Sequence, residues 1–265
     1  MPSARYPRAS KYTDLDLVYS QCSGPGGLEL AEFLGDRLEL SPGMRVLDVG
    51  SYRGYQSCFL AREYDVQVVA IDPLDDREDG RPMAEHTLAN AASWGVGTSV
   101  LPLKLQLKPS PSEGHSVPTT PFAENTFDAV YCTTALEMVR SYWGEAGYQS
   151  CLAEIRRVLR PGAVFGLAEP MHHDRPIPED LLPHVSQKFG WKECFRSLGH
   201  TVESVDAAGF VTLESGHAPD AQAWWQAYAS HDPFCKLKPD GDPKTLAVDA
   251  GRWVSFGYVV ARNPE

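Results

Sequence analysis

Residues 44–61, MRVLDVGSYRGYQSCFLA, decide the fold. The segment RVLDVG at residues 45–50 is a short, largely apolar run that is typical of a buried strand. Gly50 and Gly54 then indicate a tight turn, and the following residues 55–63 are expected to form a helix. A second buried strand, QVVAID at residues 67–72, stops at an acid followed by a proline. This order predicts a βαβ unit, in which the two strands lie parallel.

Strands and helices continue to alternate on both sides of this unit. We expect helices at residues 27–40, 88–92, 179–189 and 201–208, and one that ends at residues 160–162. Further strands are expected at residues 99–107, 127–132, 163–169, 210–214 and 253–260. The four prolines of residues 108–121 predict an exposed loop. Because no long helix separates the last two strands, the pattern predicts an α/β fold with a mainly parallel sheet and an antiparallel edge.

The composition fits one globular domain. The chain has 265 residues, and single cores stop growing near about 250–300 residues. Its formal net charge of -11 disfavours nucleic acid and anionic membranes as partners. The chain contains no run of roughly 18 apolar residues and no N-terminal signal segment, so we expect a cytoplasmic protein without membrane association. The six cysteines form no CxxC pair and are expected to be reduced thiols, most of them in the core.

The chemistry is expected at the carboxyl ends of the first two strands. Ligands of open α/β sheets bind beyond these ends, where the strand order reverses. Gly50 and Gly54 let a ligand approach the backbone, and the next helix offers free N–H groups to an anion. Asp72 ends the second strand, where its carboxylate can accept hydrogen bonds from both hydroxyls of a ribose. These residues predict an adenosine-type cofactor, and NAD fits them as well.

The later motifs separate these alternatives. In order and spacing, the chain resembles the motif series of class I S-adenosylmethionine-dependent methyltransferases through MRVLDVGSYRGYQSCFLA, VVAIDP, PFAENTFDAVYC, EIRRVLRPGAVFGLAEP and SVDAAGFVTLE. The resemblance extends from about residue 24 to the last strand. It implies S-adenosyl-L-methionine as cofactor and a Rossmann-like, seven-stranded sheet with an antiparallel last strand and helices on both faces. The spacing GxxxG at residues 50–54, in place of GxGxxG, also disfavours an NAD-dependent oxidoreductase.

The resemblance implies cofactor-binding residues at three places. The loop under the methionine part of the cofactor comprises Asp48, Gly50, Ser51 and Gly54. Asp72, which Pro73 follows, is implied to bind the ribose. Thr133 and Thr134, just past the fourth strand, are implied to face the reacting centre.

Two positions depart from the family pattern. Tyr52 stands where the family usually has glycine, and we expect it to cover the cofactor or to touch the substrate. The family usually has an acid near the adenine in the loop before residue 121, where this chain has Ser116-Val117-Pro118. Glu113 is a candidate substitute, so the residue that contacts adenine stays open.

Residues 1–40 resemble the lid and leading helix of small-molecule methyltransferases, and residues 41–265 resemble the methyltransferase domain that this lid covers. Tyr12 and Tyr19 are candidates to close over the sulfonium or the substrate, because aromatic faces attract cations. Simple packing is the alternative for both. Gly24 and Gly26 are candidates to lie beside the cofactor carboxylate.

Candidate catalytic residues follow the fifth strand. His172 or His173 could act as a general base, since this edge of the sheet faces the cleft and histidine titrates near neutrality. Exposed loop histidines are the alternative. With Asp174 they offer no recognisable metal-ligand spacing, so no metal is expected. Trp224 and Trp225 are candidates for a substrate pocket, with core packing as the alternative.

These features predict an enzyme that transfers a methyl group from S-adenosylmethionine to an O, N, S or C nucleophile of a small metabolite. Such a transfer is an in-line displacement in which the protein mainly aligns the reactants at about 3–3.5 Å. The alternatives are an NAD-dependent oxidoreductase and a non-catalytic S-adenosylmethionine-binding protein. The acceptor, the pathway and the oligomeric state stay open.

Overall fold

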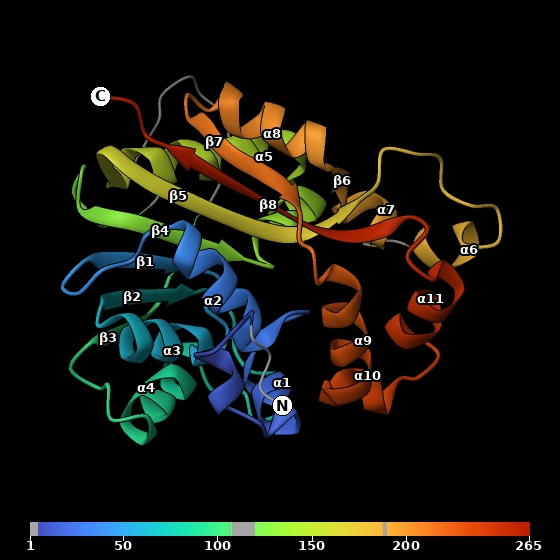
Figure 1. Cartoon of the computed structure of the whole chain (residues 1–265), viewed down its shortest axis with the longest axis horizontal. Coiled ribbons are helices and arrows are strands. Elements are labelled where there is room, and N and C mark those ends of the chain that lie inside the picture. The colour runs from blue at the N-terminus through green and yellow to red at the C-terminus, as the bar shows by residue number, and fades with distance from the viewer. Residues whose placement is uncertain (1–4, 106, 108–119, 188–189) are drawn as a thin grey trace.

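The structure, a computed structural model, describes residues 5–105, 107, 120–187 and 190–265. Its strands are β1 (Arg45–Val49), β2 (Gln67–Asp72), β3 (Val100–Lys104), β4 (Phe127–Thr133), β5 (Leu159–His172), β6 (Arg196–Ser197), β7 (Val211–His217) and β8 (Val254–Arg262). They form one eight-stranded sheet in the order β3-β2-β1-β4-β5-β8-β7, with the short β6 paired to β5 (Figure 1).

The strand directions confirm the predicted topology. The neighbours among β3, β2, β1, β4 and β5 pair in parallel, whereas β8 runs antiparallel to both β5 and β7. The two-residue β6 adds one strand to the seven that the family resemblance implies. Because the strand order reverses between β1 and β4, the carboxyl ends of these strands form the crevice in which α/β folds bind ligands.

Helices cover both faces of the sheet. The N-terminal half contains η1 (Ala9–Lys11), α1 (Leu15–Gln21), α2 (Gly27–Arg37), α3 (Tyr55–Tyr64) and α4 (Met83–Ser93). The C-terminal half contains α5 (Leu136–Val158), α6 (Leu182–Val185), α7 (Trp191–Cys194), α8 (Leu198–Ala207), α9 (Ala221–His231), α10 (Pro233–Leu237) and α11 (Asp242–Asp249). Among the described residues, no helix is both long and apolar enough to cross a membrane.

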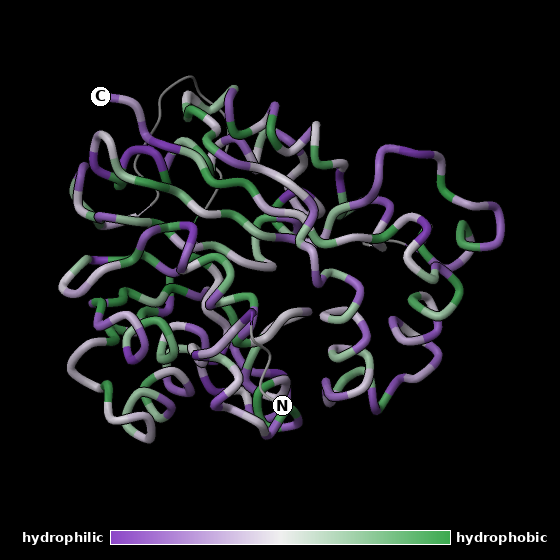
Figure 2. The backbone as a smooth tube through the Cα atoms, viewed as in Figure 1, coloured by the Kyte–Doolittle hydropathy of each residue, from purple (hydrophilic) through white to green (hydrophobic). Residues whose placement is uncertain are grey.

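Alternation along the strands builds two hydrophobic clusters. Val46 faces the cluster that contains α2 and α3, whereas its neighbour Leu47 faces the cluster that contains α5 and α8. Both side chains are fully buried, as expected for a parallel strand that is covered on both faces. Figure 2 shows the hydrophobic residues along the strands and the hydrophilic ones on peripheral helices and loops.

Three helical predictions need correction. In the part of residues 179–189 that the structure describes, only the four-residue α6 is helical, and Pro183 stands inside it. The helix predicted at 201–208 starts three residues earlier, because the Ser197 hydroxyl caps it by accepting a hydrogen bond from His200 N. The helix predicted to end at residues 160–162 already ends at Val158, because residues 159–162 belong to β5. Its first part is separated from the rest at Gly144, whose φ of 68° and ψ of -169° are not helical. Most of the loop predicted at residues 108–121 lies outside the described residues.

Candidate active site

A cavity of about 250 Å³ lies at the carboxyl ends of β1, β2 and β4. Its lining brings together Gly50, Tyr52, Asp72, Pro73 and Thr134, five of the residues that the sequence singles out. They come from three strand ends that are far apart in the sequence and adjacent in the sheet. The crevice expected from the strand order therefore contains a cavity of ligand size.

Asp72 offers a carboxylate to this cavity. The side chain is 5% exposed, and its two oxygens accept hydrogen bonds from Tyr52 N at 2.8 Å and Leu74 N at 2.9 Å. Burial raises the pKa of Asp72, and the two backbone N–H groups oppose that shift. Each carboxylate oxygen has a further lone pair, so Asp72 can also accept hydrogen bonds from a diol.

The loop after β1 is as tight as its glycines predict. Gly50 has a φ of 78°, and a Cβ atom there would lie 2.3 Å from the Cβ of Ala135 at the start of α5. Gly50 N and Ser51 N both donate to the main-chain oxygen of Ile71, at 2.9 and 3.1 Å. Gly54, with a φ of 69°, would clash with Thr87 if it carried a side chain. Only glycine fits at residues 50 and 54 without displacing Ala135 or Thr87.

Asp48 joins β1 to α3, the two elements that this loop connects. It is buried, lies outside the cavity lining and accepts a hydrogen bond from the Ser57 hydroxyl of α3. Burial raises its pKa to about 7. Contact between Asp48 and the cofactor stays a prediction, and its observed partner is a side chain of the protein.

Tyr52 lines the cavity in a strained backbone conformation. Its φ is 51°, in the left-handed region that residues other than glycine rarely adopt. This geometry explains why glycine is usual at this position of the family pattern. The side chain is half-buried in the lining that also contains Asp72, and whether it covers the cofactor or touches the substrate stays a prediction.

The glycine-rich segment before α2 packs on the end of β4. Thr134 Oγ1 donates to the main-chain oxygen of Ser23 at 2.9 Å, and a Cβ atom at Gly24 would lie 2.8 Å from Thr134 Cγ2. Thr133 is buried below and donates to Gln56 Oε1 at 2.9 Å. Of the two threonines, only Thr134 belongs to the cavity lining.

Four other candidates lie together in a separate place. A second cavity of about 390 Å³, between the N-terminal residues, α2 and α9, is lined by Tyr12, Tyr19, Gly26 and Trp224 among others. Tyr12 stacks on Trp94 with ring centroids 4.8 Å apart. None of the four lines the cavity at the strand ends. Their roles at the sulfonium, the carboxylate or the substrate stay predictions.

Trp225 belongs to the core. It is 4% exposed, donates from Nε1 to the main-chain oxygen of Ser255 and contacts the rings of Trp191 and Phe195. Its backbone neighbour Trp224 donates instead to Glu29, at 2.9 Å. The packing alternative therefore describes Trp225, and a substrate role for it stays untested.

The two histidines differ from exposed loop residues. His172 is the last residue of β5 and stacks on Trp253 with ring centroids 4.7 Å apart, while His173 lies 4.6 Å from the ring of His217. Burial lowers the pKa of both residues. Neither lines the cavity at the strand ends. The lowered pKa favours the neutral form of both imidazoles, and a role as general base stays a prediction for both.

Sequence reasoning missed the apolar wall of the cavity. The first two turns of α5 contribute Leu136, Met138, Val139, Tyr142 and Trp143, and residues after β2 and β3 add Leu74 and Leu105. Trp143 is 45% exposed and Leu74 is 56% exposed, which is unusual for large apolar side chains. The spacing of apolar residues just after β4 was the available signal. Glu113, the candidate adenine ligand, lies outside the described residues.

The described residues contain one group of three side chains that could hold a metal ion. It consists of Asp76, Asp79 and His86 in the loop after β2 and at the start of α4. This group does not include His172, His173 or Asp174.

Comparison with known proteins identifies the domain. Residues 47–167 match a family model described as a methyltransferase domain. The chain carries a class I S-adenosylmethionine-dependent methyltransferase domain. The matched residues run from β1 into β5, so they include the strand ends that form the cavity. S-adenosylmethionine is the cofactor of this class, and this disfavours the nicotinamide alternative.

A curated relative and two solved structures are similar to this methyltransferase domain. Sterol 24-C-methyltransferase ERG6B of Gibberella zeae is 27% identical over 186 residues, which are 68% of this chain and 43% of the relative. Phosphoethanolamine N-methyltransferase 2 of Haemonchus contortus, solved with S-adenosyl-L-methionine, has a TM-score of 0.69 at 17% identity and covers 99% of this chain and 60% of its own. The [4+2]-cyclase SpnF has a TM-score of 0.68 at 18% identity, covering 99% and 97%.

The sequence similarity to the sterol methyltransferases and the structural similarity to the solved proteins support different conclusions. The chain spans less than half the length of the curated sterol methyltransferases that it matches. The structural matches, all at low identity, show the fold. Because a fold carries several activities, the acceptor has to be argued from the site.

Proposed function

We propose that this chain transfers a methyl group from S-adenosylmethionine to a nucleophilic O, N, S or C atom of a small metabolite. The cavity at the strand ends is the observation that carries the proposal. Asp72 offers the acceptor atoms that a ribose diol requires, and Leu74 and Met138 belong to an apolar wall that suits a flat adenine base. When bound, the cofactor supplies an electrophilic methyl group.

The residues of the chain hold and orient the reactants in this proposal. The loop at residues 50–54 packs closely on Ala135 and Thr87 because its glycines carry no side chains, and this packing fixes the loop that lines the cavity. Thr134 and Ser23 fix the glycine-rich segment over the end of β4. A methyl transfer needs little more than such alignment, since proximity supplies much of the rate acceleration.

A small acceptor fits the surroundings of the cavity. The helix α1 contacts both α9 and α10, so we propose that residues 1–40 act as a lid over the domain of residues 41–265.

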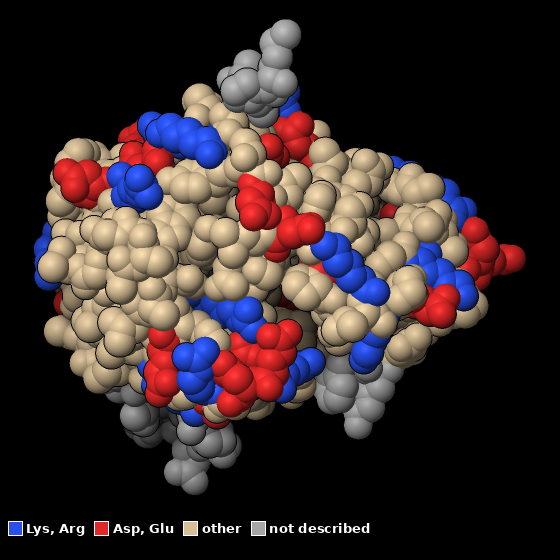
Figure 3. Space-filling view, turned by 90° about the horizontal axis from the view of Figure 1, so that it is seen from below, with Lys and Arg blue, Asp and Glu red and all other residues tan. Residues whose placement is uncertain are grey.

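On the face in Figure 3, acidic and basic side chains of the described residues lie beside one another, without a broad basic area. This surface and the net charge of -11 favour a metabolite over a nucleic acid.

His172 or His173 is the proposed proton acceptor. An amine or hydroxyl acceptor loses a proton as it gains the methyl group, and a neutral imidazole at the end of β5 can take it. No metal takes part in this proposal, so turnover should survive exhaustive treatment with a chelator.

Cofactor binding and product formation test the proposal separately. Calorimetry should show that the purified chain binds S-adenosylmethionine and S-adenosylhomocysteine, but not NAD. Incubation with a metabolite extract and methyl-labelled cofactor should then transfer label to a small molecule and release S-adenosylhomocysteine. Binding without transfer to any metabolite would favour the non-catalytic alternative, and tight NAD binding would overturn the cofactor assignment.

A further inference from the structure

Arg53 joins its own loop to two other segments around the cofactor cavity without lining the cavity. The residue lies between Tyr52 and Gly54 in the loop after β1, and its side chain is 12% exposed. Tyr52 belongs to the cavity lining, whereas Arg53 points away from it toward other elements. This placement suits a residue that positions the cavity walls.

The first contact joins the loop to α1. Arg53 Nη1 donates to the main-chain oxygen of Ser20 at 3.1 Å. A parallel connection runs through Asn90 of α4, whose Nδ2 donates to Arg53 O at 2.8 Å and to Gln21 Oε1 at 3.0 Å. Two residues after Gln21, Ser23 enters the cavity lining. Arg53 therefore fixes the end of α1 close to the point where the chain reaches the cavity.

The second contact joins the loop to the segment after β2. Arg53 Nε donates to Asp76 Oδ2 at 2.9 Å, and Nη2 lies 2.6 Å from the same oxygen. Nη2 also donates to Glu78 at 3.2 Å. Pro73 and Arg77 of this segment line the cavity. Asp76 is 4% exposed, and charge-assisted hydrogen bonds of this kind are among the stronger ones in proteins.

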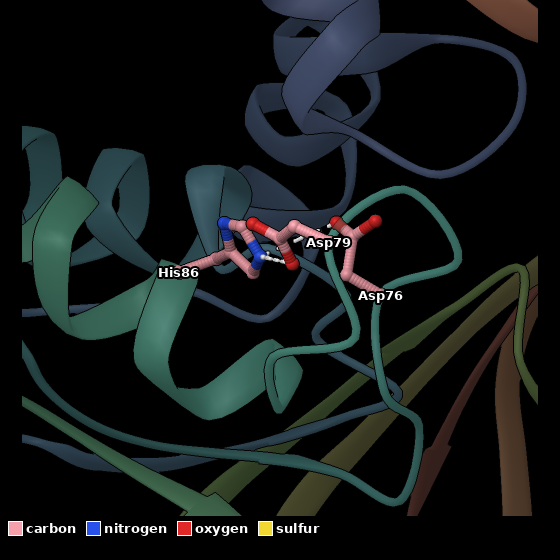
Figure 4. Close-up of side chains that lie close together, drawn as sticks. All are labelled: Asp76, Asp79 and His86. Atoms are coloured by element: carbon pink, nitrogen blue, oxygen red, sulfur yellow. Dashed lines mark hydrogen bonds and ion pairs between the residues drawn. The ribbon is translucent and has the colours of Figure 1, made fainter.

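The same aspartate belongs to the group that resembles a metal site. In Figure 4 the carboxyl groups of Asp76 and Asp79 and the ring of His86 point toward one another, and their ligand atoms lie within 4.8 Å. Arg53 already pairs with Asp76, and Arg81 pairs with Asp79 at 2.7 Å. Because guanidinium groups neutralise both carboxylates, we assign the group to ion pairs, of which only the Arg53–Asp76 pair is buried.

We propose that Arg53 is a positioning residue for the cofactor. It holds the end of α1, the loop after β1 and the segment after β2 at the spacing that cofactor binding requires. Without Arg53, these three segments become ordered only when the cofactor binds. The conformational entropy lost in that step lowers the affinity for the cofactor. The inference rests on the proposed function only for the identity of the cofactor.

Calorimetry with S-adenosylhomocysteine tests the inference on the full chain. Arg53→Gln should weaken binding by about tenfold or more, because several hydrogen bonds of a charged group are lost together. Arg53→Lys keeps the charge and should recover part of the affinity. Arg81→Gln is the matched control, since Arg81 pairs with Asp79 of the same group but contacts neither α1 nor the loop after β1. The control should bind within about twofold of the wild type.

A fourth variant and a stability measurement separate positioning from general damage. Because Asp76 is one of several partners of Arg53, adding Asp76→Asn to Arg53→Gln should weaken binding no further than Arg53→Gln alone, within about twofold. Without cofactor, Arg53→Lys should unfold at a temperature close to that of the wild type. If Arg53→Gln does not fold, the affinity of Arg53→Lys for S-adenosylhomocysteine decides the test. A folded Arg53→Gln with wild-type affinity, or an equal loss in Arg81→Gln, would overturn the inference. If Arg53→Gln does not fold, wild-type affinity in Arg53→Lys would overturn it instead. Absence of binding by the wild type would instead contradict the proposed function.

Discussion

At the scale of single residues, Asp72 combines two tasks in one carboxylate. It holds the loop after β1 and the segment after β2 through the N–H groups of Tyr52 and Leu74. It also presents its oxygens to the cavity, where a ribose diol can donate to them. The residue therefore acts on the cofactor and on the shape of the site that receives it.

Substitution of Asp72 should reduce cofactor affinity more than stability. Hydrogen bonds to a charged group contribute about 1.5–3 kcal/mol, so Asp72→Ala should weaken S-adenosylhomocysteine binding by about tenfold to a hundredfold. Asp75→Ala is the control, because Asp75 is exposed and pairs with Lys104 at the surface. Calorimetry measures both variants. Unchanged affinity in a folded Asp72→Ala variant would remove Asp72 from the binding site.

The histidines at the end of β5 give a kinetic prediction. If one of them is the base, His172→Ala or His173→Ala should lower kcat by about a hundredfold with little change in cofactor affinity. Burial lowers both pKa values below 6.5, so the rate of the wild type should fall only as the pH drops below that value. This limb of the pH profile should disappear in the variant, and His184→Ala should retain it. Wild-type rates and profiles in both variants would favour catalysis by alignment alone.

At the scale of elements, Gly144 divides α5 into two parts with separate tasks. The part before it carries Met138, Val139 and Trp143 of the cavity wall, and the part after it packs Leu152 and Ile155 against the sheet. The φ of 68° and ψ of -169° at Gly144 belong to a region that is essentially restricted to glycine. The break lets the two parts take different directions.

Alanine at Gly144 should destabilise the protein although it meets open space. No described atom lies within 4 Å of the added Cβ, so the expected cost of about 1–3 kcal/mol comes from the backbone conformation alone. Gly199→Ala is the matched control, because Gly199 is an exposed helical residue with equally open space. It should stabilise the protein by up to about 1 kcal/mol. Chemical denaturation measures both, and equal effects would contradict the assigned strain.

The elements also show which part of the fold the sequence could predict. The strand at residues 67–72 was predicted with its observed bounds, and the helix at 55–63 ends within one residue of α3, because both follow local patterns. The parts of the site that long-range contacts decide were missed. Arg53 binds Ser20 and Asp76, which are 33 and 23 residues away, and no local spacing indicates such partners. The wall on α5 depends equally on how that helix is placed over the strand ends.

At the scale of the whole molecule, several acids lie buried in the sheet and its helices. Burial raises the pKa of Asp48 to about 7. Burial and the nearby Glu169 also raise the pKa of Glu137 in α5. Arg140 contacts Glu169 in the same region and offsets part of the charge. A folded chain that retains protons on buried acids has a stability that depends on pH above their ordinary range.

The pH dependence of unfolding should reveal the proton on Asp48. Above the ordinary pKa of 3.8 the unfolded chain loses this proton, while the folded chain retains it up to about pH 7. The folded state then binds more protons, so the contribution of Asp48 to stability falls as the pH rises through this window and stays constant above it. Asparagine cannot ionise, so Asp48→Asn removes this pH-dependent loss of stability. The difference in free energy of unfolding between the variant and the wild type should therefore shift in favour of the variant by roughly 2 kcal/mol from pH 5 to pH 8. This corresponds to a shift of several degrees in unfolding temperature. Glu203→Gln on the exposed side of α8 is the control and should give a constant offset. Parallel curves for Asp48→Asn and the wild type across this range would show that the folded chain does not retain the proton.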